Sequence, residues 1–191
     1  MSGTLAITGD DYADRLLNTS GTALLTGMLL DQQVPMEWAF HGPATLSRRL
    51  GHLDAASIAA MDIDAFVAVC CDKPAIHRFP AAMGRRIHQM CQVLVEAYGG
   101  EGSGVWADGP DAATLFARIR ALPGYGPEKS MIFLALLAKR FGVRPEGWEE
   151  LAGPFGDDEP RSVADIEGEE SLARVREWKR LKRAAGKTKQ D

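Results

Sequence analysis

The chain has 191 residues, a formal net charge of −4 at neutral pH and 46% hydrophobic residues. Such a chain forms one domain or two small lobes and is long enough to bury a core. No apolar run reaches the roughly 18 residues that a membrane-spanning helix needs, and the N-terminus lacks the basic and apolar segments of a signal peptide. We therefore expect a cytoplasmic protein with no membrane partner.

Apolar spacing and the residues that start and stop helices predict an all-α chain without strands or internal repeats. In chain order, we expect helices over residues 11–18, 20–33, 35–40, 43–50, 62–71, 80–98, 114–122, 127–140 and 169–185. Single helical turns are expected before Ala60 and over residues 148–151. Gly- and Pro-rich segments separate several of these helices, most clearly over residues 99–110 and 142–160.

The three cysteines and four histidines form no pattern that is typical of a disulfide framework or a metal site. Cys70 and Cys71 are adjacent, which is poor geometry for binding one metal ion, and the sequence has no C-x-x-C pair. The histidines are scattered along the chain and form no H-x-x-x-H pattern. We expect no metal and no other cofactor.

Charge is distributed unevenly in the C-terminal quarter of the chain. Residues 146–170 hold ten acidic residues and one arginine, whereas residues 171–191 hold eight basic residues and two acidic ones. A basic segment of this kind is either a solvated helix with a frayed end or a surface that contacts phosphate groups. The charge pattern suggests three parts, namely a helical domain over residues 1–151, an acidic linker over 152–168, and a basic helix and tail over 169–191.

The most informative segment is residues 122–130, LPGYGPEKS, which joins two expected helices. Gly124 and Gly126 permit backbone angles that other residues avoid, and Pro127 suits the first position of a helix. The N–H groups at a helix start point outward and attract anions. Lys129 adds a positive charge in the first turn, where the helix dipole alone favours an acid. The segment therefore predicts a phosphate-binding turn.

The string L-P-G-Y-G resembles the hairpin of the helix-hairpin-helix DNA-binding motif. Over residues 23–148, the order of helices resembles the HhH-GPD superfamily of base-excision DNA glycosylases. The helix that ends in LLDQQ (29–33) is similar to the early helix of the family, and MGRRI (83–87) is similar to the K-A-x-x-I segment that precedes its long helix. The resemblance implies an all-α fold with a cleft between two helical lobes, acting as a monomer on double-stranded DNA.

The family also implies which residues contact DNA. Members hold a phosphodiester with the hairpin and place a residue of the Gln-containing segment into the duplex beside an extruded base. In this sequence the matching positions are Gly124, Tyr125, Gly126, Glu128, Lys129 and Ser130 in the hairpin, with Gln33 and its neighbour Gln32 in the other segment. A protein with these contacts associates with the nucleoid when it is bound to DNA.

The catalytic positions of the family differ in this chain. The usual aspartate in the loop after the hairpin has no counterpart, and Glu146 is the nearest match. Trp148 lies beside it, either lining a base pocket or covering the core. The position of the lysine that forms a Schiff base in the bifunctional members is Glu128, so we expect no lyase activity. No cysteine follows Cys91, so the iron–sulfur loop of some members is absent.

Three functions remain open from the sequence. The first is a monofunctional DNA N-glycosylase, a hydrolase of base-excision repair, with Glu146 as its carboxylate. The second is a DNA-binding protein without catalytic activity, which the missing aspartate and lysine favour. The third is a helical protein-interaction domain, which the net negative charge favours.

Overall fold

In a computed structural model, which describes residues 1–186, 188 and 190, the chain is all-helical and no strand occurs among these residues. This confirms the all-α prediction. The helices are α1 (Asp11–Thr19), α2 (Gly21–Leu30), α3 (Met36–Leu50), α4 (Ala55–Ala60), α5 (Ile63–Cys71), α6 (Pro80–Tyr98), α7 (Ala112–Ala121), α8 (Pro127–Phe141), α9 (Trp148–Ala152) and α10 (Glu169–Ala184), with short 3₁₀ helices η1 (Gly102–Val105), η2 (Gly153–Gly156) and η3 (Val163–Asp165).

The helix ends follow local side-chain chemistry. Aspartates accept hydrogen bonds from the first free backbone N–H groups of four helices, at Asp10, Asp54, Asp62 and Asp111. Glycines in the left-handed conformation end three helices, at Gly51, Gly99 and Gly142. These residues explain why most element boundaries are readable from the sequence.

One expected boundary is absent. We expected a helix break before Pro43, but α3 continues through it as one helix over Met36–Leu50. A proline inside a helix removes one backbone hydrogen bond. Here the helix is held on both sides of the proline by fully buried side chains, including Phe40 before it and Leu46 after it. Tertiary packing therefore outweighs the tendency of Pro43 to interrupt the helix.

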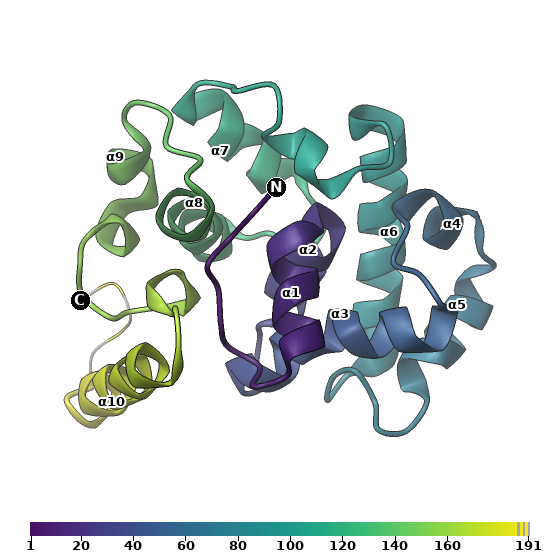
Figure 1. Cartoon of the computed structure of the whole chain (residues 1–191), viewed down its shortest axis with the longest axis horizontal. Helices are drawn as coiled ribbons and strands as arrows, with labels where there is room; N and C mark the ends of the chain where they lie inside the picture. The colour runs from purple at the N-terminus through teal and green to yellow at the C-terminus, as the bar shows by residue number, and fades with distance from the viewer. Residues whose placement is uncertain (187, 189, 191) are drawn as a thin grey trace.

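Helix α2 is the centre of the molecule. Each of its ten residues is buried. Figure 1 shows α3–α6 on one side of α2 and α7–α10 on the other, with α1 lying against it. The two ends of α2 are therefore the places where elements distant in the sequence meet.

The segment over residues 152–168, which we expected to be an acidic linker, is packed against the rest of the chain. Phe155, Val163 and Ile166 are at most 1% exposed and belong to the hydrophobic core. Some of its carboxylates form ion pairs, since Asp165 pairs with Lys139 of α8 at 2.6 Å and Asp157 pairs with Arg161 at 2.8 Å.

Within the part of the chain that the structure describes, no helix is long and apolar enough to cross a membrane.

Candidate nucleic-acid interface

The predicted hairpin forms a tight turn between α7 and α8. Gly124 has a φ of +85°, which is the left-handed conformation that glycine adopts without strain. The Tyr125 N–H closes the turn by donating to the Leu122 carbonyl at 3.1 Å. Gly126 precedes α8 with an extended backbone and no side-chain cap. Both glycines are exposed, and neither N–H donates to a backbone carbonyl of a described residue.

The hairpin thus presents backbone N–H groups at the start of a helix, with open space in front of Gly126. No atom of the described residues lies within 4 Å of the place where a Cβ of Gly126 would stand. An anion at this position meets N–H donors and the positive end of the α8 dipole. This geometry is what the phosphate-binding prediction requires.

Two hairpin residues that we expected to contact DNA have their side chains in the interior instead. Tyr125 is 4% exposed, donates from its hydroxyl to the Leu25 carbonyl at 2.8 Å, and packs edge-on against Phe133 at 5.6 Å between ring centroids. Burial raises its pKa well above the usual value. Ser130 is fully buried and donates to the Gly126 carbonyl at 2.9 Å. Closing the turn against α2 requires these side chains for packing.

Lys129 lies half-buried between α8 and α2. Its ammonium group donates to the carbonyls of Met28 and Leu29, at 2.6 and 2.8 Å. These are carbonyls of the last turn of α2, where a positive charge is favourable. Neighbouring Glu128 is also half-buried, and its carboxylate accepts a 3.3 Å hydrogen bond from Gln190. The two Lys129 hydrogen bonds attach the hairpin to the C-terminal end of α2.

The α2–α3 loop, which carries both predicted glutamines, lies beside the hairpin. A Cβ on Gly124 would stand 3.4 Å from Leu29 and 3.7 Å from Arg86, so the turn, α2 and α6 meet there. The Gln32 side chain donates to the Leu29 carbonyl at 2.8 Å and accepts from Arg86 at 3.3 Å. Gln33 is exposed and has a φ of +59°, a conformation that is uncommon for residues other than glycine. The loop fixes Gln32 and exposes Gln33.

Two residues at this site were missed by the sequence analysis, His77 and Phe79. His77 is 1% exposed; its Nε2–H donates to the Gln32 carbonyl at 2.9 Å, and its Nδ1 accepts the Phe79 N–H at 3.0 Å. Phe79 is a 46% exposed aromatic at the start of α6. The sequence signal for Phe79 was that a large apolar residue stands directly before Pro80, which starts a helix, and belongs to no apolar helix face. The imidazole ring of His77 therefore holds the backbone of Phe79 close to the α2–α3 loop.

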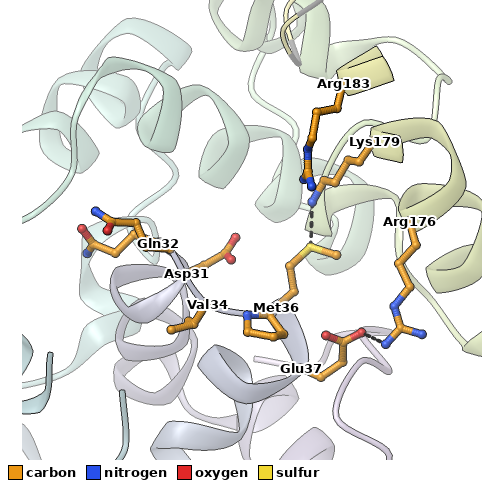
Figure 2. A pocket seen from close by; sticks show the side chains of 10 residues that line it. Asp31, Gln32, Val34, Met36, Glu37, Arg176, Lys179 and Arg183 are labelled. Carbon is orange, nitrogen blue, oxygen red and sulfur yellow. Dashed lines mark hydrogen bonds and ion pairs between the residues drawn. The ribbon is translucent and has the colours of Figure 1, made fainter. Parts of the chain in front are cut away.

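A cavity of about 500 Å³ separates the α2–α3 loop from α10. Figure 2 shows Asp31 and Gln32 on one side of it and the basic residues of α10, Arg176, Lys179 and Arg183, on the other. Arg176 forms an ion pair with Glu37, and the Lys179 ammonium lies 2.9 Å from the Met36 sulfur. The basic C-terminal helix is thus brought to the loop that carries Gln33.

The predicted catalytic residue, Glu146, lies elsewhere. It is exposed in the loop that follows α8, which Arg144 fixes to the last turn of α8 by donating to the Ala138 carbonyl at 2.8 Å. Helix α8 has 15 residues and is therefore about 20 Å long, with the hairpin at its other end. Trp148 is 8% exposed and belongs to the core. Neither residue lines the cavity beside α2.

A carboxylate that does line the cavity is Asp31, directly after α2. Figure 2 shows it pointing into the space between the loop and α10. It is partly exposed, and no described residue forms an ion pair or a side-chain hydrogen bond with it. A negative charge at the C-terminal end of a helix is unfavourable, so its position does not serve helix stability.

Comparisons of the sequence with models of protein families and with curated proteins found no match in either case.

Proposed function

We propose that this protein binds duplex DNA with the hairpin and the α2–α3 loop, and that it acts in repair of the base-excision type. The supporting observation is that Gly124 of the hairpin packs against Leu29 of α2, and that the loop directly after α2 exposes Gln33. The hairpin, which can bind a phosphate group, and Gln33, which can enter a duplex, thereby form one structural unit. Phosphate contacts position a protein on DNA, and inserted side chains distort the duplex.

Gln33 and Phe79 are the side chains that we assign to the duplex. Both are exposed, and His77 bonds the backbone beside each of them, since it donates to the carbonyl of Gln32, next to Gln33, and accepts from the Phe79 N–H. Apolar wedges such as phenylalanine enter between base steps in proteins that bend DNA, and amide side chains form hydrogen bonds with base edges. Cations lie beside them, since Arg86 contacts Gln32, and the Arg78 guanidinium lies 5.4 Å from the Phe79 ring centroid.

Binding of a labelled duplex of about 20 base pairs at increasing NaCl concentrations tests this function. We expect the logarithm of the affinity to fall linearly with the logarithm of the salt concentration, because each phosphate contact releases counterions. A set of duplexes with uracil, an oxidised base, an alkylated base or an abasic site measures preference for damage. Absence of duplex binding at 50 mM NaCl would overturn the proposal.

A second candidate, hydrolysis of the N-glycosidic bond, is favoured by the position of Asp31. In such a reaction water adds to the sugar carbon, the base departs with the bond electrons, and a carboxylate accepts the proton of the water or stabilises the positive charge of the sugar. We assign that role to Asp31, which lines the cavity, in preference to Glu146. DNA binding without chemistry is the remaining alternative.

Base release from the same duplexes distinguishes the two candidates. For an enzyme, we expect Asp31→Asn to abolish release while duplex affinity is retained, and Glu146→Gln to release base at the wild-type rate. Activity of Asp31→Asn equal to wild type would remove Asp31 from the mechanism. Binding of every duplex without release of any base would leave the protein as a DNA-binding module.

A further inference from the structure

Two large aromatic side chains, Trp38 and Phe79, are exposed around the buried ring of His77. Trp38, in the first turn of α3, is 41% exposed, and Phe79, directly before α6, is 46% exposed. The His77 ring centroid lies 6.4 Å from that of Trp38 and 6.1 Å from that of Phe79, distances that are typical of packed aromatic pairs. The three rings form one aromatic cluster with two exposed members.

Hydrogen bonds fix each member of the aromatic cluster. The Trp38 Nε1–H donates to the Ala75 carbonyl at 3.3 Å. The His77 ring donates to the Gln32 carbonyl at 2.9 Å and accepts the Phe79 N–H at 3.0 Å. Groups that are already held in position lose little conformational freedom when a ligand packs on them. The cluster is therefore preorganised to receive a flat ligand.

Basic side chains accompany the exposed rings. The Arg78 guanidinium lies 5.4 Å from the Phe79 ring centroid, and Lys73 is exposed in the same loop. Neither cation forms an ion pair with a residue that the structure describes. Asp72 is the only acidic residue in the segment 72–79. Stacking rings beside cations are typical of proteins that bind single-stranded nucleic acid, because every nucleotide offers a base to stack and a phosphate.

From this arrangement we propose that Trp38 and Phe79 stack on unpaired bases of a single-stranded DNA segment that continues one strand of the bound duplex. The place of the cluster supports this, since His77 joins it to the α2–α3 loop at the Gln32 carbonyl. Trp38 does not line the cavity beside that loop, so the bases on the cluster are not the base at the cavity. The inference rests on the proposed function and names its ligand class, a duplex with unpaired nucleotides at its end.

Duplexes of about 20 base pairs with a single-stranded overhang of about six nucleotides test the aromatic cluster. One overhang is oligothymidine and the other consists of abasic residues, so the two have equal numbers of phosphates and differ only in bases. Each is made with the overhang at the 5′ end and at the 3′ end. In one of these polarities, we expect wild type to bind the oligothymidine overhang about fivefold or more tightly than the abasic one, because each stacked base contributes about 5- to 150-fold in affinity.

Three variants assign this preference to the ring of Trp38. Trp38→Leu removes the ring and Trp38→Phe keeps one, while both lose the hydrogen bond to Ala75. Trp178→Leu is the control, because Trp178 lies on α10, with Arg161 and Lys182 over its ring at 5.1 and 5.0 Å. Circular dichroism and thermal unfolding verify that the variants fold. We expect Trp38→Leu to decrease the preference about fivefold or more, Trp38→Phe to retain part of it, and Trp178→Leu to retain all of it.

The outcomes separate the aromatic cluster from the proposed function. If wild type binds blunt duplex but does not distinguish the two overhangs, stacking is overturned while duplex binding stands. An unchanged preference in folded Trp38→Leu, or equal losses in Trp38→Leu and either other variant, would overturn stacking on Trp38. Binding of the oligothymidine overhang without any binding of blunt duplex would overturn the proposed function and leave the cluster standing. If wild type binds none of these DNAs at low salt, both fail.

Discussion

The hydroxyl of Tyr125, in the hairpin, donates a 2.8 Å hydrogen bond to the backbone carbonyl of Leu25, in the middle of α2. With the Lys129 contacts to the last turn of α2, it fixes the hairpin to α2, which ends at Leu30 and leads into the loop that carries Gln33. The two segments assigned to DNA are therefore one structural unit, although about 90 residues separate them in the sequence.

Tyr125→Phe removes the hydroxyl and keeps the ring packing. We expect the free energy of unfolding to fall by about 1 kcal/mol, the usual contribution of one buried hydrogen bond. Urea unfolding followed by tryptophan fluorescence measures it. Tyr12→Phe is the matched control, because the Tyr12 hydroxyl contacts Ser47 from a residue that is 39% exposed. Equal losses in the two variants would contradict a special role for the buried bond.

His77→Phe keeps an aromatic ring and removes both hydrogen bonds that hold the Gln32 carbonyl and the Phe79 N–H. We expect lower duplex affinity with an unchanged salt slope, because His77 orients the loop and contacts no phosphate. His52→Phe is the control, since among the described residues His52 accepts a local N–H bond from Asp54 and forms no other hydrogen bond. A decreased slope in His77→Phe would show instead that a phosphate contact has been lost.

Phe79→Ala tests the aromatic wedge. We expect a loss of duplex affinity of about 5- to 150-fold, because stacking on an aromatic ring contributes about 1–3 kcal/mol per base, and little loss of stability, because the ring is 46% exposed. Leu181→Ala removes a similarly exposed apolar side chain, 55% exposed, from α10. If both variants bind duplex as wild type does, Phe79 does not enter the DNA.

The three cysteines differ in reactivity. Burial raises the pKa of the Cys70 and Cys91 thiols from 9.0 to about 12 in the folded protein, whereas Cys71 is exposed. We expect one thiol to react with a thiol reagent at pH 8 in native protein and three in urea. Unfolded thiols ionise from about pH 9, so the unfolded state binds fewer protons above this pH and stability falls as pH rises. Three fast thiols in native protein would contradict the burial of Cys70 and Cys91.

The all-α class and most helix boundaries were predictable from the sequence because the helix ends rely on local chemistry. Asp10, Asp62 and Gly99 terminate helices by hydrogen bonds or backbone angles within a few residues. Pro43 was misjudged because the packing that keeps α3 continuous comes from distant residues. The core packing of residues 152–168 was missed for a related reason, since their acidic composition hides Phe155, Val163 and Ile166.

The candidate site was only partly predictable. Gly124 follows from a local backbone demand, its positive φ, whereas Gln33 was expected only from the family resemblance. The inward position of Tyr125 and the approach of Lys179 to Met36 depend on how helices pack, which no single segment specifies. The same holds for Glu146, which the spacing suggested and which lies at the far end of α8 from the hairpin.

The most direct measurement of the central claim is the duplex affinity of Gly126→Leu. Gly126 has a φ of −76°, and no described atom lies within 4 Å of its Cβ position, so leucine fits without strain and covers the N–H groups of the turn. Gly168→Leu is the control, because Gly168 also precedes a helix with an extended backbone and open space. We expect Gly126→Leu to unfold at the wild-type temperature and lose at least tenfold in affinity, while Gly168→Leu binds as wild type does. Wild-type affinity in a folded Gly126→Leu variant would contradict DNA binding by the hairpin.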